Sequence, residues 1–419
     1  MKRRQFLKLA AAGATLSAAG CATMSPAKAR VVVIGAGFGG ATAAKYIRMW
    51  DQGIEVTLVE RSPFFISCPI SNLVLGGSKT IDDIRRGYGG LEKYGVRLVG
   101  DEATAIDTAK RSVKLGGGTE LPYDRLIVSP GIDFLFGELP GYDAAAKAGR
   151  VLHAWKAGTQ TLLLRQQLEA MPDGGVYVLS IPLAPYRCPP GPYERACQVA
   201  SYFKKAKPRS KVLVVDANPD VTSKAGLFKK AWAELYPGII EYRGNAKAVD
   251  VDFKTMTVKL ELDEVKGDVL NVVPPHRAGD IAAKTGLITT NNRWCNVDWR
   301  TMESTAVPGV HVLGDSTLSA PAMPKSGHMA NQHGKVAAAA IVELLNSRAP
   351  NPNPVLTNTC YSFVSDTDVI HVASVHQWSE KDKTVTPVPG SGGVSAARSQ
   401  QEGIYGWSWA QNIWADMLS

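Results

Sequence analysis

The sequence lacks several patterns that would place it in common classes of protein. No two of its six cysteines form CxxC, and CxxCH is absent, which excludes a zinc ribbon and a c-type haem attached to this chain. Beyond the N-terminal segment no apolar run is long enough to span a bilayer. No stripe of Lys and Arg alternates with aromatic residues, as nucleic-acid binding would require. We therefore expect a globular chain with no metal site, no membrane segment in the mature protein and no nucleic-acid partner.

The first 29 residues lack acidic side chains altogether. Their basic residues are Lys2, Arg3, Arg4, Lys8 and Lys28, and without these five the rest of the chain holds 42 basic and 38 acidic residues. The N-terminus resembles a twin-arginine export signal, because Arg3-Arg4 is followed by QFLK and then by an Ala/Leu/Gly run. The AKA sequence at 27–29 has the form of a cleavage site. We expect export of the folded chain to the periplasm. A lipid anchor at Cys21 is the less favoured alternative, because Ala18 is a poor residue for such a site.

Residues 30–60 have the order of a nucleotide-binding unit. The β-branched run 31–34 suits a buried parallel strand. Gly35, Gly37 and Gly40 then supply GxGxxG where this strand turns into a helix. The first glycine permits the tight turn, the second lets the backbone approach a pyrophosphate, and the third allows close helix–strand packing. The phosphates are expected at the helix N-terminus, where free N–H groups and the macrodipole favour an anion.

A carboxylate completes this unit. The second strand, residues 54–59, ends in Glu60, where an acid accepts a hydrogen bond from the ribose 2′-OH. A free ribose favours FAD or NAD over NADP. The alternative is a glycine-rich turn that binds nothing, and the complete order of strand, helix, strand and acid argues against it.

Two later strands are expected to return to the same domain. Residues 123–131 form a buried strand that ends at Gly131, where the chain of flavoproteins with two dinucleotide-binding domains leaves the FAD domain. Residues 308–316 form another, which ends in Gly314-Asp315. An Asp in this position can hold the ribityl or pyrophosphate part of FAD, and capping of a turn is the alternative.

A long helix is expected to follow these strands. Lys325, Ser326 and Gly327 open it, and it runs to about residue 345. Its N-terminus can point at the flavin pyrimidine ring and stabilise negative charge there. These three residues are therefore predicted to belong to the cofactor site.

Residues 151–271 have the outline of a second nucleotide-binding domain without the fingerprint of one. Where GxGxxG is needed, the chain reads IPLAPYRCPPGPYERA. Its prolines remove the N–H groups and small residues that cradle a pyrophosphate. This disfavours NAD(P)H, so electrons must enter by another route. Cys188 is the reactive group in this turn.

The order of the motifs carries a family resemblance. GxGxxG is followed by FISCPISNLVLGG, RCPPGPYERA, LGDS, PKSGHMANQHGK and TCYSFV. This order is similar to that of the flavoprotein subunit of flavocytochrome c sulfide dehydrogenase across essentially the whole mature chain. The cysteine-bearing segments are far more specific than the glycine motif.

The resemblance implies roles for four residues. Cys68 would hold FAD through a thioether to the flavin 8α-methyl carbon, Cys188 and Cys360 would form a redox-active disulfide beside the flavin, and Glu194 would transfer a proton. Alternatives are a structural disulfide or two buried thiols for the pair, a free buried thiol for Cys68, and stabilisation of a helix dipole for Glu194.

The remaining cysteines, Cys197 and Cys295, have no role in the resemblance, and whether they pair with each other is open. The expected fold is α/β, with two Rossmann-like domains as in glutathione-reductase-like flavoproteins and a C-terminal α+β cap or interface domain. We expect a signal peptide at 1–29, the FAD domain at 30–150 and 272–350, the second domain at 151–271 and the cap at 351–419.

The expected activity is FAD-dependent oxidation of sulfide to sulfur or polysulfide, with a c-type cytochrome subunit as electron acceptor. FAD converts a two-electron input into one-electron outputs, which need a haem that this chain lacks. One alternative is a sulfide:quinone oxidoreductase-like enzyme, although the Pro, Gly, Ser and Thr content after residue 351 argues against a deep membrane anchor. Another is a flavoprotein partner of a sulfur-oxidation complex that is not itself catalytic.

Overall fold

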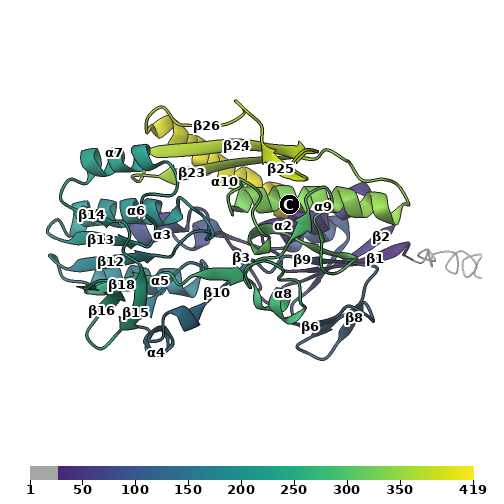
Figure 1. Cartoon of the computed structure of the whole chain (residues 1–419), viewed down its shortest axis with the longest axis horizontal. Coiled ribbons are helices and arrows are strands. Elements are labelled where there is room, and N and C mark those ends of the chain that lie inside the picture. The colour runs from purple at the N-terminus through teal and green to yellow at the C-terminus, as the bar shows by residue number, and fades with distance from the viewer. Residues whose placement is uncertain (1–26) are drawn as a thin grey trace, which may run out of the picture.

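The computed structural model describes residues 27–419 of the chain. The twin-arginine motif and Cys21 lie outside the described residues. Figure 1 shows two lobes side by side, with a third layer across both of them. The fold is α/β, as predicted.

The first lobe is built on a seven-stranded sheet. Its order is β20 (Val297–Asp298), β21 (Glu303–Ser304), β22 (Val310–Val312), β9 (Arg125–Val128), β1 (Ala29–Ile34), β2 (Ile54–Val59) and β5 (Val96–Val99). The strands from β22 to β5 are parallel, and their near-continuous apolar sequences fit burial on both faces. The predicted strand–helix–strand order at 30–60 is confirmed, with β1 beginning at Ala29.

Two long helices pack together on this sheet (Figure 1), namely α2 (Phe38–Trp50) and α9 (Gly327–Leu345). Their backbones approach closely, since a Cβ atom on Gly334 of α9 would lie 2.5 Å from the carbonyl oxygen of Gly39. The small helix α8 (Asp280–Lys284) completes this lobe.

A meander of three antiparallel strands projects from the first lobe, β6 (Ala103–Asp107), β7 (Ser112–Leu115) and β8 (Glu120–Pro122). In the sequence, residues 96–115 alternate in the manner of a β-meander, and only the part from residue 103 onwards belongs to one. Residues 96–99 form β5 at the edge of the parallel sheet, because β5 pairs with β2. A short hairpin, β3 (Phe65–Ile66) with β4 (Arg85–Arg86), and α3 (Ser71–Gly76) lie between β2 and β5 in sequence.

The second lobe repeats this plan with a five-stranded parallel sheet. Its order is β11 (Val151–Leu152), β18 (Val269–Val272), β12 (Val176–Ile181), β13 (Lys211–Asp216) and β14 (Ile240–Arg243). Its helices are α4 (Tyr142–Lys147), α5 (Thr159–Ala170), α6 (Gly191–Ala206) and α7 (Ala225–Leu235). It also carries a meander, β15 (Ala248–Asp252), β16 (Thr257–Leu260) and β17 (Glu264–Lys266). The pair β10 (Ile132–Phe134) and β19 (His276–Ala278) forms the link where the chain passes between the lobes.

The third layer consists of a sheet and one helix. The strands are β23 (Val355–Phe363), β24 (Val369–Ser379), β25 (Thr384–Pro387) and β26 (Gly393–Val394), and the helix is α10 (Gln400–Leu418). The end of α10 is fixed to the first lobe, because Lys45 of α2 donates to the carbonyl oxygens of Ala415 (3.3 Å) and Asp416 (2.8 Å). Gln198 of α6 donates to the carbonyl oxygen of Phe363 at 2.8 Å. The layer is thereby tied to both lobes.

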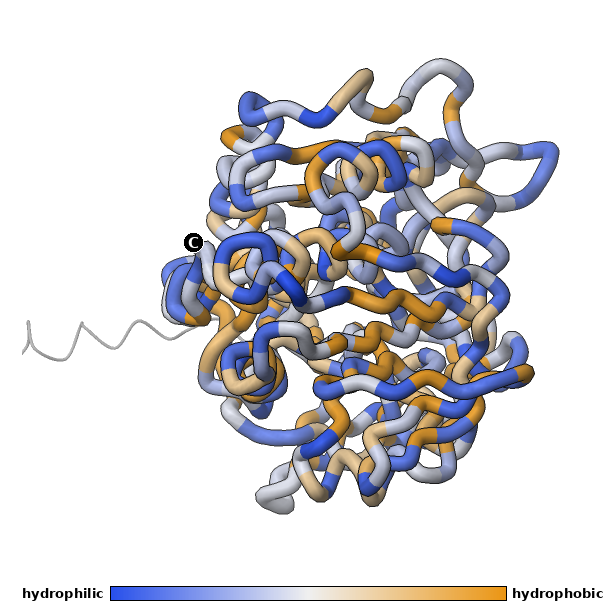
Figure 2. The backbone as a smooth tube through the Cα atoms, turned by 90° about the vertical axis from the view of Figure 1, so that its left-hand side faces the viewer, coloured by the Kyte–Doolittle hydropathy of each residue, from blue (hydrophilic) through white to orange (hydrophobic). Residues whose placement is uncertain are grey.

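Apolar side chains gather in separate cores for the two lobes. Figure 2 shows hydrophobic stretches concentrated on strands that cross the interior and hydrophilic stretches in outlying loops. Cys295 lies in the core of the first lobe and Cys197 in that of the second. Within residues 27–419, none of the helices combines the length and the apolar character needed to cross a membrane.

Candidate active site

A cavity of about 920 Å³ lies where the two lobes and the third layer meet. Segments far apart in the sequence form its wall. The predicted site residues on this wall are Gly35, Gly37, Glu60, Cys68, Gly131, Cys188, Glu194, Gly314, Asp315, Ser326, Gly327 and Cys360. Two predicted residues, Gly40 and Lys325, do not line it.

One end of the cavity is the glycine turn before α2. Gly37 precedes the helix, no side chain caps the helix end, and a Cβ atom on Gly37 would meet nothing within 4 Å. The first N–H groups of α2 therefore face open space that an anion can fill. Glu60 is fixed beside this turn, because its carboxylate accepts hydrogen bonds from the N–H groups of Ala36 and Ser62, each at 2.9 Å.

Gly40 serves packing, not the cavity wall. A Cβ atom at this position would lie 1.9 Å from the carbonyl oxygen of Gly35, so only glycine lets α2 approach β1. Gly35 itself has a φ of 92°, a conformation that glycine adopts without strain. The expected close packing at the third glycine is thus present, and Gly40 does not line the cavity.

Asp315 follows β22 and lies on the cavity wall. Its Oδ1 atom is buried and has no hydrogen-bond partner. Burial raises the pKa of this carboxyl, and the positive charges of Arg187 and Lys325 oppose the rise. An unpaired buried acceptor is costly, so this atom is placed to receive a donor from a ligand.

Lys325, which was predicted as part of the cofactor site, does not line the cavity. Its ammonium group turns away from the cavity, donates to the carbonyl oxygens of Asp315 and Thr317, and lies 3.7 Å from the ring centre of Trp294. Burial lowers the pKa of Lys325 to about 7. Its backbone has a role at the site, because its carbonyl oxygen accepts the N–H of Cys188 at 2.8 Å.

Ser326 caps the N-terminus of α9 at the cavity. Its hydroxyl oxygen accepts the N–H of Met329 at 3.0 Å, and its O–H donates to Asn358 on β23 at 2.6 Å. Gly327 begins the helix. The positive end of α9 thus faces the cavity, as the sequence predicted for a helix directed at a flavin.

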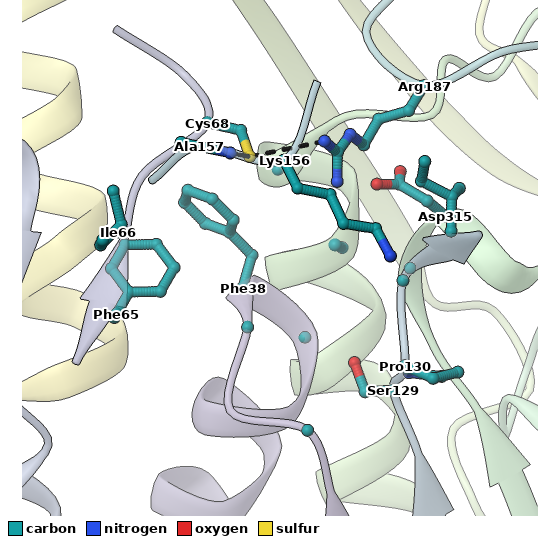
Figure 3. A pocket seen from close by; sticks show the side chains of 18 of the residues that line it. Phe38, Phe65, Ile66, Cys68, Ser129, Pro130, Lys156, Ala157, Arg187 and Asp315 are labelled. Carbon is teal, nitrogen blue, oxygen red and sulfur yellow. Dashed lines mark hydrogen bonds between the residues drawn. The ribbon is translucent and has the colours of Figure 1, made fainter. Parts of the chain in front are cut away.

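Cys68 lies on the opposite wall with two donors at its sulfur (Figure 3). The N–H of Ala157 donates to Sγ at 3.4 Å, and the guanidinium of Arg187 donates to it at 3.5 Å. Arg187 lies between Cys68 and the carboxylate of Asp315 in this view. The guanidinium thus places a positive charge 3.5 Å from the sulfur.

Cys188 precedes α6 in a left-handed conformation, with a φ of 58°. A Cβ atom on Gly191 would lie 2.8 Å from its Sγ, so this glycine makes room for the sulfur at the start of the helix. Cys360 comes from β23, and the Asn358 amide donates to its Sγ at 3.4 Å. In the structure all five described cysteines are free thiols.

The pKa values of both thiols are raised, and Cys360 contributes to the rise at Cys188. Burial raises the pKa of Cys188, and the charge of Cys360 is the next largest cause. Burial also raises the pKa of Cys360, and the positive charge of Lys224 opposes this rise most strongly. Both residues line the cavity, so sulfurs 172 positions apart in the sequence face one space.

Glu194 is in the first turn of α6 and is 6% exposed. It accepts hydrogen bonds from the N–H of Phe363 and from the amide of Asn72, each at 2.8 Å. Burial raises its pKa, and these two donors oppose the rise. A carboxyl with a raised pKa that shares a cavity with two thiols is a candidate for proton exchange with them.

The sequence did not reveal three polar residues of this site. Arg187 stands in the quoted RCPPGP segment and Asn72 in SCPISN, so their positions next to reactive cysteines were the available signal. No motif in the sequence indicated a role for Lys224. Its ammonium is buried and donates to the carbonyl oxygen of Cys360 at 3.0 Å and to Ser362 Oγ at 2.8 Å. Burial lowers the pKa of Lys224 to about 8.

In the second lobe, the acid at the position where a ribose would bind is buried inside the protein. Asp216 ends β13, in the position that Glu60 occupies after β2, but it is fully buried. Its Oδ2 atom accepts the hydroxyl groups of Tyr193 (2.8 Å) and Tyr242 (3.0 Å). Together with the proline-rich turn, this enclosure disfavours a nicotinamide nucleotide there.

The first-lobe cavity fits FAD. It offers open N–H groups at α2, an acid after β2, a buried acceptor without a partner at Asp315 and a second helix N-terminus at α9. Gly35, Gly37, Glu60, Gly131, Gly314, Asp315, Ser326 and Gly327 would hold it. Within residues 27–419, no group of three or more His, Cys, Asp or Glu side chains could hold a metal ion.

Fold and site together define a FAD-binding oxidoreductase. Residues 29–167 match the family "Pyridine nucleotide-disulphide oxidoreductase". The crystal structure of the sulfide:quinone oxidoreductase of Aquifex aeolicus superposes with a TM-score of 0.75 and 19% identity over 93% of this chain and 91% of that one. At this identity the likeness shows the fold.

Two further family models match later parts of the chain. Residues 161–274 match "Sulfide dehydrogenase [flavocytochrome c] flavoprotein chain, central", and residues 352–418 match "Flavocytochrome c sulphide dehydrogenase, flavin-binding". The flavoprotein chain of this enzyme from Chlorobaculum thiosulfatiphilum is 60% identical over 45 residues, which are 11% of this chain and 94% of that sequence. This chain belongs to the family of flavocytochrome c sulfide dehydrogenase flavoprotein chains, as the resemblance predicted.

A relative with lower sequence identity is a sulfide:quinone oxidoreductase. The mitochondrial sulfide:quinone oxidoreductase of Mus musculus is 24% identical over 329 residues, covering 73% of this chain and 69% of the mouse protein.

Proposed function

We propose that this chain oxidises sulfide with FAD and a redox-active pair, Cys188 and Cys360, and passes the electrons to a c-type cytochrome. One observation carries the proposal. Two cysteines from distant segments and a buried carboxyl, Glu194, line the same cavity as the FAD-binding glycines. The family of the chain supports sulfide as the substrate.

The chemistry begins with a disulfide between Cys188 and Cys360 in the oxidised enzyme. Hydrosulfide attacks one sulfur, the S–S bond breaks, and the products are a persulfide on one cysteine and a thiolate on the other. The attacking sulfur loses its proton, which the ionised Glu194 is placed to accept. Oxidation of hydrosulfide to zero-valent sulfur releases two electrons and one proton in total.

The thiolate formed in this step needs stabilisation in a buried space. Lys224 lies beneath Cys360, and Cys188 stands at the N-terminus of α6, where the helix dipole favours negative charge. FAD, when bound, takes up two electrons and releases them singly. The cytochrome is proposed as the acceptor because one-electron carriers suit this output.

FAD is proposed to be attached covalently through Cys68, and the chain is proposed to act in the periplasm after twin-arginine export. The N-terminal sequence supports the second proposal. The position of Cys68 supports the first, because this residue lines the same cavity as the residues that would hold FAD.

The electron acceptor separates this proposal from a sulfide:quinone oxidoreductase-like activity, which the mouse and Aquifex relatives favour. Anaerobic assays with sulfide should show fast reduction of an oxidised c-type cytochrome and slow reduction of a short-chain quinone. Faster reduction of the quinone than of the cytochrome would identify a quinone as the electron acceptor.

A flavoprotein that supports a sulfur-oxidation complex without catalysis is a further alternative. It predicts that the cysteine pair can be removed without loss of sulfide-dependent flavin reduction. The purified chain with a Cys188→Ser substitution tests this, because our proposal predicts loss of that reduction.

A further inference from the structure

We propose that Arg187 is the positioning residue that prepares the Cys68 sulfur to form its bond with FAD. This inference rests on the proposed attachment at Cys68. It concerns how the enzyme matures, which is separate from how it oxidises sulfide.

Hydrogen bonds hold both the backbone and the guanidinium of Arg187. The backbone N–H of Arg187 donates to His276 Nδ1 at 3.0 Å, and its backbone carbonyl oxygen accepts the indole N–H of Trp155 at 3.1 Å. Its guanidinium donates to the carbonyl oxygen of Trp155 and to the sulfur of Cys68. Since burial holds the pKa of His276 well below its ordinary value, this imidazole stays neutral and keeps its role as acceptor.

The positive charge of Arg187 is not consumed by an ion pair. In the part of the chain that the structure describes, no carboxylate oxygen lies within 4.0 Å of its guanidinium nitrogens, which donate to the Trp155 carbonyl oxygen and the Cys68 sulfur instead. Figure 3 shows the guanidinium directed at Cys68 on one side and facing Asp315 on the other. Its charge is therefore available to a thiolate at Cys68.

The bond-forming step requires that thiolate. Cys68 Sγ loses its proton and bonds to the flavin 8α carbon, which gives up one hydrogen as a proton. The two electrons released by forming the C–S bond pass to the flavin ring and then to a one-electron acceptor, such as the proposed cytochrome, or to dioxygen. Arg187 stabilises the thiolate by a charge-assisted hydrogen bond and holds Sγ at the cavity wall.

A merely structural role for Arg187 is the competing explanation, because Arg187 also holds Trp155 and precedes Cys188. Two substitutions separate the roles. Arg187→Gln removes the charge but retains donors, and Arg187→Lys retains the charge on a differently shaped side chain. Both proteins are purified with their flavin, and acid precipitation divides covalent from extractable flavin.

We expect the unsubstituted protein to carry acid-stable flavin on a Cys68 peptide. Arg187→Gln should carry flavin that acid extracts, and its conversion to the acid-stable form should be at least tenfold slower and should accelerate as the pH is raised. Arg187→Lys should convert faster than Arg187→Gln at neutral pH.

Three results overturn the inference. The first is acid-stable flavin in Arg187→Gln at the level and rate of the unsubstituted protein. The second is slow conversion in both variants with no recovery at high pH, which would mark Arg187 as structural. The third is absence of flavin on Cys68 in the unsubstituted protein, which would refute the attachment itself but leave sulfide oxidation to be judged by its own assay.

Discussion

The carboxylate of Glu194 accepts the backbone N–H of Phe363 at 2.8 Å. This hydrogen bond joins the helix that follows Cys188 to the strand that carries Cys360. The two cysteine segments are therefore held together by a group that can also move a proton. The same residue would serve the geometry and the chemistry of the proposed pair.

Glu194→Gln should lower the rate of sulfide-dependent flavin reduction by about 100-fold, the lower range for loss of a general base. Burial raises the pKa of Glu194, and a base works only when ionised. The rate of the unsubstituted protein should therefore fall as the pH drops through this raised pKa. Stopped-flow pH profiles measure this. A fall of the same size and position in Glu194→Gln would exclude Glu194 as its source.

Lys224→Met should slow the same reaction, because Lys224 opposes the effect of burial on the pKa of Cys360. The advantage of the unsubstituted protein should be largest below pH 8 and shrink above it, since the pKa of Lys224 is about 8 and the ammonium is lost as the pH rises. Lys229→Met is the control within α7, the helix that Lys224 precedes, because the Lys229 side chain is half exposed and pairs with Asp220. Equal rates for the two variants at pH 7 would contradict the role of Lys224.

Two glycines of the α2 turn should respond differently to a methyl group. Gly40→Ala should lower the free energy of unfolding by ~1–3 kcal/mol, the range for overpacking. The reason is that the new Cβ atom would clash with the Gly35 carbonyl oxygen. Gly37→Ala should leave the stability of the flavin-free protein unchanged but weaken FAD binding, since its Cβ enters the open cradle. Thermal unfolding and FAD titration test both, and equal destabilisation by the two would be inconsistent with these positions.

Cys68→Ser should retain FAD that acid extracts completely. The glycine turn, Glu60 and Asp315 would still hold the dinucleotide, while the serine hydroxyl is a far weaker nucleophile than a thiolate. Flavin fluorescence of the acid pellet and supernatant measures the outcome. Acid-stable flavin in Cys68→Ser would move the attachment to another residue.

The local parts of the fold were predictable from sequence. Strand, glycine turn, helix and terminal acid at 30–60 follow each other closely, so periodicity and turn chemistry specify them. The alternation of residues 96–115 is typical of a meander, but residues 96–99 pair with β2 and so belong to the parallel sheet. Strand pairing depends on neighbours that the segment itself does not encode.

The cavity was predicted where a residue's role depends on its backbone position, as at Gly37 and Ser326. Lys325, which was predicted for the cofactor site, does not line the cavity, and its side chain donates to the carbonyl oxygens of Asp315 and Thr317. Arg187 and Lys224 were not predicted, because the direction of a side chain cannot be read from the sequence around it. Their contacts with Cys68 and Cys360 arise from tertiary packing between segments distant in sequence.

The central claim is that electrons from sulfide reach FAD through Cys188 and Cys360. Anaerobic mixing of sulfide with the purified flavoprotein, followed by the visible absorbance of the flavin, tests it most directly. We predict rapid bleaching in the unsubstituted protein and in Cys197→Ser, whose residue is buried in the second-lobe core and accepts the indole N–H of Trp232. Cys188→Ser and Cys360→Ser should keep FAD but fail to bleach, and bleaching of either at the unsubstituted rate would contradict the account.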